Sequence, residues 1–521
     1  MRHALRFIVG ACLCCGASWS AAAQTPPPLD AEAGLSLEEV LQITLRDNPN
    51  IRVAARQVDT QHGVLVAAGD PFDPKVQTSF ARNRFNERQA DLSASRSPWL
   101  DISQTQYSIG LQKQLRQGIL VAPEIGVSRT ALPGLGIDAT SQATAKLNVL
   151  VPLLRDRGGF VTSAPERAAA RAWDASKLQT EHVMAQSVLA AVTAYWDCQS
   201  AAMRLDVLND SEARARRLLD DTRRLVEAGE RPLSDLPQVR GNAAAKRVTR
   251  MSAEQAVVDS RVRLGLVMGL GPTETAALRL AAAPFPGVDV AGVSAAAASS
   301  ATARLPALVA DALDRRPDLL ATAKNVESAR MLADAARENL KPRVDLISSI
   351  GYAGLQIGGG SLGSLFSPIV RNVPGPDLSI SLRYQWAAAN VSARGQLLQT
   401  EASYAEQRIA EQEVQRQIRI GVQQASESIG RHAAAMTEAH DAVTLYQEMV
   451  RSEQRKFQLG VSTLFDTIQS ADALTNVRLS EIAAGREYAV ALAMLRFQTG
   501  SLIIAGPQGA TVNVDRLLSP R

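Results

Sequence analysis

Two aspartates occupy matching positions in two similar stretches of the sequence. Asp466 ends the stretch K-F-Q-L-G-V-S-T-L-F-D, which starts at Lys456, and Asp235 ends R-L-V-E-A-G-E-R-P-L-S-D, which starts at Arg224. Each stretch lies between two long helical runs, so each aspartate stands near the start of a helix. A carboxylate there interacts favourably with the positive end of the helix. The simplest chemistry for both acids is therefore helix capping.

Glycines and hydroxyl side chains complete the two stretches. Gly229 and Gly460 lie 231 residues apart, the same offset that separates the two aspartates. A glycine just past a helix end adopts the left-handed conformation at low cost, so both glycines are predicted C-caps. Ser234 in the first stretch, and Ser462 or Thr463 in the second, can cap the N-terminus of the following helix. Both stretches are therefore predicted to be the tips of helical hairpins.

No other group of side chains has the spacing of a reactive site. The closest two of the five histidines, His432 and His440, lie too far apart along one helix to share a metal ion. Motifs for phosphate binding and for nucleophilic catalysis are absent from the sequence. Cys198 is the only cysteine beyond residue 15 and falls on an apolar helical seam, which predicts a packed thiol. We expect no catalytic site, no cofactor and no metal site.

The N-terminus has the features of a secretory signal peptide over residues 1–23. Two arginines precede an apolar run, and small residues end at Ala23; Cys12 also weakly resembles a lipid-attachment site. Residues 24–34 form a Pro-rich leader, and no later run of about 18 apolar residues predicts a membrane-spanning helix. The net charge of +4 is small and no basic block occurs, so nucleic acid is not an expected partner.

The sequence is a duplication of one structural unit. The first repeat covers residues 35–271 and the second covers 305–500; residues 272–304 are predicted to link them, and 501–521 form a short tail. Each repeat is expected to contain two short helices, a strand hairpin and a long helical hairpin. The strand hairpins are predicted at 74–155 and 343–388, and the helical hairpins at 163–270 and 393–499.

The first strand segment is longer than the second by 37 residues, because the offset between equivalent residues falls from 268 before it to 231 after it. The added residues are placed within 104–139, where alternation around a Gln117-Gly118 turn indicates an additional hairpin. Both strand segments alternate apolar and polar residues, as in Val76, Thr78 and Phe80. This pattern, with aromatic residues beside it, is typical of membrane strands. Soluble hairpins are the alternative, although an isolated hairpin is barely stable in water.

Each helical hairpin is predicted to contain one helix of about 66 residues, near 100 Å long. Its returning helix is only about 55 Å long and leaves nearly half of the partner uncovered. The second short helix of each repeat, at 50–69 and 318–339, is expected to stack end to end on the returning helix. In the second repeat a seven-residue spacing predicts a coiled-coil seam. The seam residues are Val422, Ile429, Met436, Val443, Val450 and Phe457.

In this order and in duplicate, the features resemble the TolC-like outer membrane efflux family over essentially all of the sequence beyond the signal peptide. The matching motifs are Asn48-Pro49, Arg316-Pro317, V-L-V-P-L-L-R-D-R-G from Val149, Tyr195-Trp196 and the two tips. The resemblance implies a mainly α fold with a transmembrane β-barrel of twelve strands, four from each chain of a homotrimer. The residue pattern agrees, because two hairpins cannot close a barrel alone and an open edge cannot face lipid.

The resemblance also implies a function. It implies a passive outer-membrane channel with a periplasmic extension, the exit duct of a tripartite efflux or type I secretion system. A periplasmic adaptor would open its helical tips, and an inner-membrane pump would drive the cargo. Drugs, metal ions and secreted polypeptides are all candidate cargo. A periplasmic coiled-coil adaptor or scaffold without a pore, and a secreted enzyme with an unrecognised site, are the alternatives.

By position, the resemblance assigns Asp466 to an acidic ring at the periplasmic aperture and Asp235 to the network that holds the aperture shut. Three copies of Asp466 around a narrow axis are suited to repelling anions and binding cations. The tip residues expected to contact the adaptor are Gly229, Leu233, Ser234, Gly460, Val461, Ser462, Thr463 and Leu464.

Three positions depart from the family pattern at the aperture. Phe457 stands where a tyrosine hydroxyl would bond across the tip, Ser462 replaces an arginine and Gln469 replaces a second acid. The polar lock is therefore expected to be thinner. We hypothesise that closure depends more on apolar contacts near Phe457, Leu464 and Phe465.

Overall fold

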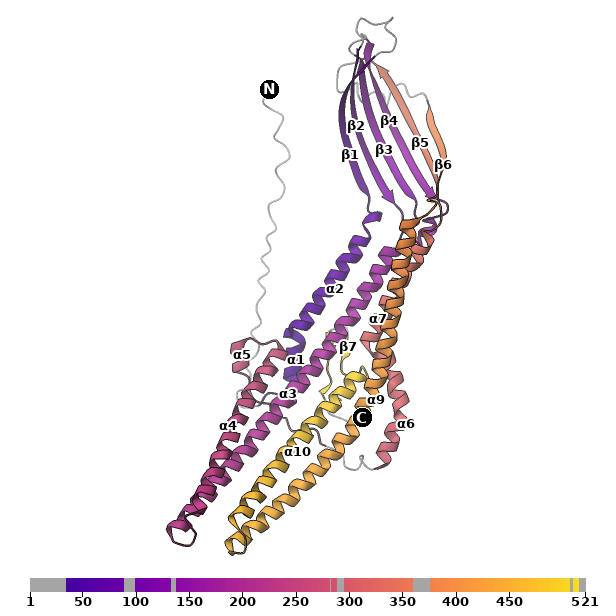
Figure 1. Ribbon diagram of the computed structural model, residues 1–521. Coiled ribbons are helices and arrows are strands. Elements are labelled where there is room, and N and C mark those ends of the chain that lie inside the picture. Colours follow the sequence, from indigo (N-terminus) through magenta and orange to yellow (C-terminus); the bar gives the residue numbers. More distant parts are fainter. Residues whose placement is uncertain are drawn as a thin grey trace, which may run out of the picture.

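The computed structural model describes residues 34–88, 99–132, 137–281, 283–287, 295–358, 375–506 and 509–514. Two long helical hairpins lie side by side at one end of the molecule, and a sheet of strands extends from the other end (Figure 1). Among the described helices, none combines the length and the apolar character needed to cross a membrane. The predicted fold class, mainly helical with a strand domain, is confirmed.

Equivalent elements follow one another in the two repeats. The first repeat contains α1 (Leu37–Asp47), α2 (Pro49–Ala68), β1 (Lys75–Arg88), β2 (Trp99–Gln114), β3 (Leu120–Leu132), β4 (Ile137–Pro152), α3 (Ala164–Glu227) and α4 (Asp235–Met268). The second contains α6 (Ala295–Arg315), α7 (Pro317–Glu338), β5 (Arg343–Ile357), β6 (Pro376–Gln385), α9 (Val391–Gln458) and α10 (Leu464–Gln498). The short elements are 3-10 turns at Asp70–Phe72 and Arg157–Gly159, α5 (Pro272–Ala276), β7 (Ile504–Gly506) and β8 (Gly509–Thr511).

Helix α6 begins at Ala295, inside the segment 272–304 that was expected to be a linker. The reason is local composition, because the first residues of α6 are mainly alanine, the best helix former. Later in the helix, Leu308 and Leu313 pack against the cluster that Ala312 forms with Ile418 of α9. An apolar face therefore holds α6 against the second long helix.

Asn48 creates the Pro-marked break between α1 and α2. Its side-chain oxygen accepts hydrogen bonds from the backbone N–H groups of Asn50 (2.9 Å) and Ile51 (3.3 Å). Pro49 takes the first helical position, where a missing N–H costs nothing. The Asn48 side-chain nitrogen donates to the carbonyl oxygen of Val267 in α4 at 2.6 Å. One residue thus starts α2 and joins it to the end of α4.

Short and returning helices meet end to end in both repeats, as predicted. Gly269 ends α4 with a φ of 81°, and a Cβ there would lie 2.5 Å from the carbonyl oxygen of Asp47. At the equivalent junction Gly500 follows α10, and the Arg316 guanidinium donates to Gln498 Oε1 at 2.6 Å. The long helices α3 and α9 run alongside both members of their stack (Figure 1).

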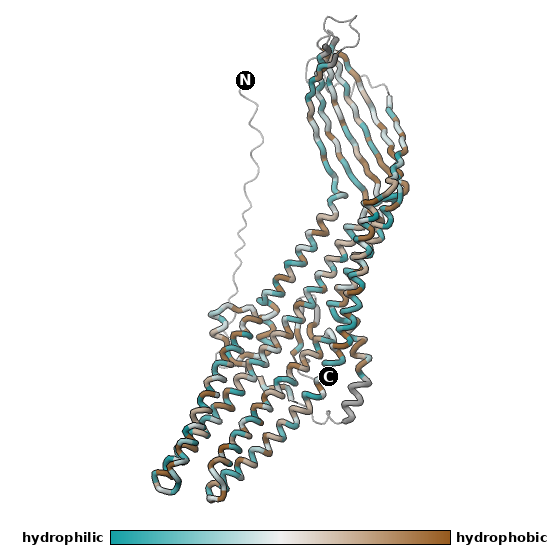
Figure 2. The backbone as a smooth tube through the Cα atoms, in the orientation of Figure 1, coloured by the Kyte–Doolittle hydropathy of each residue, from teal (hydrophilic) through white to brown (hydrophobic). Residues whose placement is uncertain are grey.

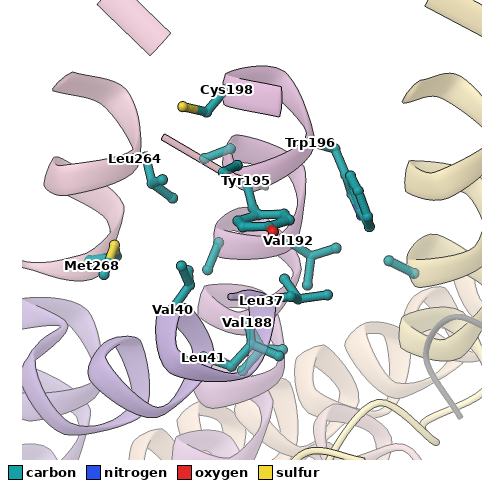
Figure 3. Close-up of a cluster of buried hydrophobic side chains, with 14 of the residues drawn as sticks. Leu37, Val40, Leu41, Val188, Val192, Tyr195, Trp196, Cys198, Leu264 and Met268 are labelled. Atoms are coloured by element: carbon teal, nitrogen blue, oxygen red, sulfur yellow. The ribbon is translucent and has the colours of Figure 1, made fainter. Parts of the chain in front are cut away.

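A cluster of buried side chains joins α1, α3 and α4 near the middle of the molecule (Figure 3). The Tyr195 hydroxyl donates to the carbonyl oxygen of Leu35 at 3.1 Å and accepts from the backbone N–H of Ala283 at 3.2 Å. Trp196 and Cys198 are fully buried in the same cluster, so the predicted packing of the thiol is confirmed. Ala489 and Ala493 of α10 belong to the same cluster, so it also joins the first repeat to the second.

The sheet has six strands, not the four implied by the family resemblance. Its order is β1-β2-β3-β4-β5-β6, with every neighbouring pair antiparallel. The additional strands are β2 and β3, which form the hairpin indicated within 104–139 and turn at Gly118 with a φ of 90°. The added residues alternate like their neighbours, so they pair within the sheet. Because β4 pairs with β5, one sheet spans both repeats.

Candidate functional site

All six strands place most of their large exposed apolar side chains on one face of the sheet, and Phe85, Leu355 and Ile357 are the exceptions on the opposite face. The register sets Phe80 opposite Tyr107, and Ile350 opposite both Leu147 and Leu378. Residues two apart continue the same face. The exposed apolar residues of this face are Val76, Phe80, Tyr107, Ile109, Leu111, Ile125, Leu147, Ile350, Tyr352, Leu378, Ile380, Leu382 and Tyr384.

Polar side chains dominate the opposite face, so hydropathy alternates along the strands (Figure 2). The hydroxyls of Ser79 and Ser108, for example, lie 2.8 Å apart across β1 and β2. The strands are 10 to 16 residues long, and about 9–11 residues suffice to cross a bilayer. One apolar face and one polar face are what a membrane barrel presents to lipid and to its lumen. The sheet therefore has the form of a segment of barrel wall.

β1 and β6 are the edges of this sheet, and in the described part of the chain no strand pairs with their outer sides. A row of unpaired backbone groups cannot face lipid. With six strands in antiparallel order, β1 and β6 run in opposite directions. The β6 edge of one copy is thus oriented to pair antiparallel with the β1 edge of the next.

Both helical tips end with the same glycine motif. Gly229 has a φ of 79° and Gly460 a φ of 75°. The next residue in each tip donates a long-range cap bond: Glu230 N–H to the Leu225 carbonyl oxygen (2.9 Å), and Val461 N–H to that of Lys456 (3.0 Å). These are the bonds of a Schellman cap, as the two glycines predicted.

Asp466 forms a capping box with Thr463 at the start of α10. The Thr463 hydroxyl accepts from the Asp466 backbone N–H at 3.2 Å, and the carboxylate accepts from the Thr463 backbone N–H at 3.2 Å and from its hydroxyl at 2.5 Å. The hydroxyl bond holds the pKa of Asp466 below its usual range. The side chain is exposed, so the carboxylate caps the helix and faces solvent at the same time.

The two other hydroxyl side chains of the tips do not cap a helix. Ser234 makes no side-chain cap bond at the start of α4. Ser462 instead donates to the carboxylate of Glu453, and this bond lowers the pKa of that acid. The predicted capping thus holds at the second tip through Thr463, one of the two alternatives there, and fails at the first tip, where Ser234 makes no cap bond.

Arg231 connects the two tips of the chain. Its guanidinium carbon lies 4.6 Å from the centroid of the Phe457 ring, and one of its nitrogens lies 3.7 Å from Asp235 Oδ2. Phe457 therefore meets a cation face-on where a hydroxyl was expected to bond across the tip. Phe465, which the hypothesis of apolar closure also names, is 60% exposed in the single chain. In this arrangement Asp235 orients Arg231, and Arg231 covers the ring.

Further polar contacts follow the interface between the two helical hairpins, and we call this set the inter-hairpin ladder. Nearest the tips, Lys246 Nζ lies 2.6 Å from Asp472 Oδ1. Beyond it the Arg214 guanidinium donates to the Thr475 hydroxyl at 3.2 Å. The remaining members are Arg478 with Asp210 (3.7 Å) and Arg486 with Asp197 (2.5 Å).

Large apolar side chains at both tips are exposed to water. Leu233 is 77% exposed in the first tip, and Leu459 and Val461 are 78% and 76% exposed in the second. Leu464 differs, because it is buried within the second hairpin and is only 5% exposed. In the single chain Leu464 thus presents little surface to a partner, and its contact with an adaptor stays a prediction. Within the described residues, no three His, Cys, Asp or Glu side chains are grouped as metal ligands.

Comparison with known proteins finds a family model that matches part of the chain. The family model described as outer membrane efflux protein matches residues 308–501. The second repeat is an outer membrane efflux protein domain. The fusaric acid resistance protein FusA of Burkholderia cepacia is 27% identical over 237 residues. That match covers 42% of this chain and spans 41% of the length of FusA.

Solved structures show that the resemblance in fold extends beyond the efflux protein domain to most of the chain. The outer-membrane channel OprN matches with a TM-score of 0.64 and 14% sequence identity, and the match covers 89% of this chain and 90% of the OprN chain. The outer membrane protein VceC of Vibrio cholerae matches with a TM-score of 0.63 and 14% sequence identity, and the match covers 89% of this chain and 96% of the VceC chain. Both repeats of this protein therefore adopt the fold of outer-membrane channels.

Sequence reasoning located the tips but missed the contacts between them. The Schellman glycines and the Thr463–Asp466 box are local patterns, and they were found. Arg231 was overlooked, because its aromatic partner lies in the other repeat and only the fold brings them together. The ladder was missed for the same reason. Its charges are ordinary helix-surface residues in the sequence.

Proposed function

We propose that this protein is an outer-membrane exit duct of a tripartite efflux or type I secretion system. Three copies close one barrel in the outer membrane, and their helices continue it as a tunnel in the periplasm. The duct is passive and catalyses no reaction, and an inner-membrane pump drives the cargo. One observation carries the proposal: the sheet has a lipid-suited face, a water-suited face and two open edges, and it continues into long coiled-coil hairpins.

In the closed duct, each chain keeps its two tips together through Arg231 on Phe457 and through the inter-hairpin ladder. Opening separates the tips and breaks these contacts. Asp235 holds Arg231 in place from the start of α4. Asp466 contributes one carboxylate from each chain to the entrance. Because its pKa is lowered, this acid is ionised at neutral pH, and three copies favour cations over anions.

The exposed apolar side chains of the tips are the docking site for a periplasmic adaptor. Leu233 and Val461 are the anchors, because each exposes most of a large apolar side chain that a partner would cover. The backbone around them is held by the two glycine caps. The remaining contact residues are Gly229, Ser234, Gly460, Ser462 and Thr463.

The first cargo to test is a small toxic molecule, since FusA is named for resistance to fusaric acid. Removing this protein from its natural host is expected to lower growth in fusaric acid, and the wild-type chain should restore it. Val461→Asp places a charge in the docking site and should fail to restore growth. Val248→Asp serves as the matched control, because Val248 is similarly exposed (67%) but lies along α4, away from the tip.

Membrane fractions must first show both variants in the outer membrane at the wild-type level. Full restoration by Val461→Asp would contradict adaptor docking at this tip. Unchanged growth after removal of the protein would contradict fusaric acid as cargo, while the conduit itself is tested separately by its conductance.

A further inference from the structure

The β2–β3 hairpin is part of the membrane wall rather than an appendage to it. β1 pairs with β2 along the full length of β1, and β3 pairs with β4 from Leu120 to Leu132. Ile109 of β2 and Ile125 of β3 face each other on the apolar side, and both are about half exposed in the single chain (52% and 45%). The two strands therefore carry part of one continuous apolar band.

We propose that the trimer closes an eighteen-stranded barrel, six strands from each chain, with a lumen wide enough to be a water-filled pore rather than a narrow exit. This inference rests on the proposed trimeric duct and adds to it the size of the outer-membrane opening. Barrels of 16–18 strands leave an aqueous channel. The polar face of the added hairpin suits that lumen, since it carries neutral groups such as Gln106, Ser108 and Ser128.

The even number of strands in each chain permits closure of an eighteen-stranded ring. Inserting one hairpin adds two strands, so β1 and β6 still run in opposite directions and copies join head to tail in one antiparallel ring. The inserted strands are also long enough to cross a bilayer, at 16 residues for β2 and 13 for β3. Neither strand has to leave the membrane layer to accommodate its neighbours.

Elementary dimensions give the size of the ring. With strands about 4.8 Å apart and tilted by about 40°, eighteen strands make a circumference near ~113 Å and a backbone diameter of about 36 Å. Twelve strands would give a diameter of only about 24 Å. Helices α2 and α7 precede β1 and β5, and α3 and α9 follow β4 and β6, so these four helices adjoin the sheet (Figure 1). Twelve helices about 9 Å apart form a ring of about 34 Å, which matches the wider barrel without a step.

Consequently, selection of cargo falls to the helical tips and not to the outer-membrane opening. A duct of this form passes any cargo that the open tips admit. Cation preference and closure are then properties of Asp466 and of the contacts between tips, and changes in the barrel lumen leave both unaltered.

The experiment compares detergent-purified trimers of the full chain and of a variant lacking Trp99–Leu132, viewed end-on by electron cryomicroscopy. The full chain is expected to show eighteen strands in a ring about 1.5 times as wide as the twelve-stranded ring of the deletion variant. A twelve-stranded ring in the full chain, with β2 and β3 outside it, overturns the inference and leaves the duct intact. Absence of any membrane-embedded oligomer overturns the duct itself.

Single substitutions keep the test decisive if the deletion variant does not fold. Ile109→Arg puts a charge on the lipid face and is expected to reduce assembled trimer in the outer membrane severalfold, because a charge there is costly. Ser108→Arg, the neighbouring residue on the polar face, is expected to assemble like the wild type. Equal assembly of the two variants would place the hairpin outside the bilayer and would overturn the inference.

Discussion

Replacing Phe457 by leucine removes the aromatic face beneath Arg231 while keeping a large apolar side chain at the tip. The guanidinium carbon lies 4.6 Å from the ring centroid, within the range of a cation–π contact. Such a contact contributes about 0.5–1 kcal/mol at a partly exposed site. If the three chains open together, the closed state loses about 1.5–3 kcal/mol, which shifts the ratio of closed to open channels about 10- to 150-fold.

Planar-bilayer recordings of the purified trimer measure this shift as the fraction of time spent open. Phe457→Tyr keeps the ring and is expected to stay as closed as the wild type. Phe465→Leu makes the same chemical change at an exposed phenylalanine eight residues away and is the matched control. The reasoning is refuted if Phe457→Leu stays closed. It is also refuted if Phe465→Leu opens equally, because apolar bulk rather than the cation–π contact would then hold the tips.

Three other predictions test the charges and caps of the helical region. Thr463→Ala should destabilise the start of α10 by about 1 kcal/mol, because the cap is lost, and should speed amide exchange in the first turn of that helix. Asp466→Asn should mainly reduce the cation selectivity of the pore in bilayers. The opposite pattern would exchange the roles of the two residues. Burial lowers the pKa of His182 below that of an ordinary histidine, so the unfolded chain takes up this proton first and stability should be lost as pH falls through the ordinary histidine range. His182→Gln should flatten the dependence of the unfolding temperature on pH in that range, and an unchanged slope would contradict the prediction. Glu212 of α3 is buried and pairs with Arg216, Arg247 and Arg250. Glu212→Gln should therefore lower the unfolding temperature at neutral pH more than Glu227→Gln, whose side chain is 64% exposed. Equal effects of the two substitutions would argue against a structural role for the buried cluster.

The duplication and the helical tips could be predicted because their signals are local. Gly229 and Gly460 mark helix ends by backbone conformation, and T-x-x-D at Thr463 is a capping pattern within one turn. The prediction that each short helix continues its returning helix followed from lengths alone. Local patterns of this kind are independent of how the two repeats finally pack.

The strand count shows where the family resemblance misled. Alternation around Gly118 indicated the added hairpin, but the resemblance implied four strands in each chain. Residue pattern is the better guide here, because a segment with one apolar face pairs with whatever membrane strand lies next to it. The extent of α6 was missed for a different reason, since an alanine-rich run between repeats has the composition of a linker and of a helix alike.

The contacts between hairpins could not be predicted from sequence. Arg231 and Phe457 come from different repeats, and the pairing of Lys246 with Asp472 depends on which faces of α4 and α10 meet. A charged residue on a long helix has many candidate partners. Only the packing of the two hairpins selects one of them.

Single-channel conductance of the detergent-purified oligomer in a planar bilayer tests the central claim most directly. An outer-membrane duct predicts a cation-selective pore that is mostly closed, with weaker selectivity in Asp466→Asn. A protein that stays soluble without detergent and forms no pore at any concentration would contradict the duct and would favour a periplasmic scaffold.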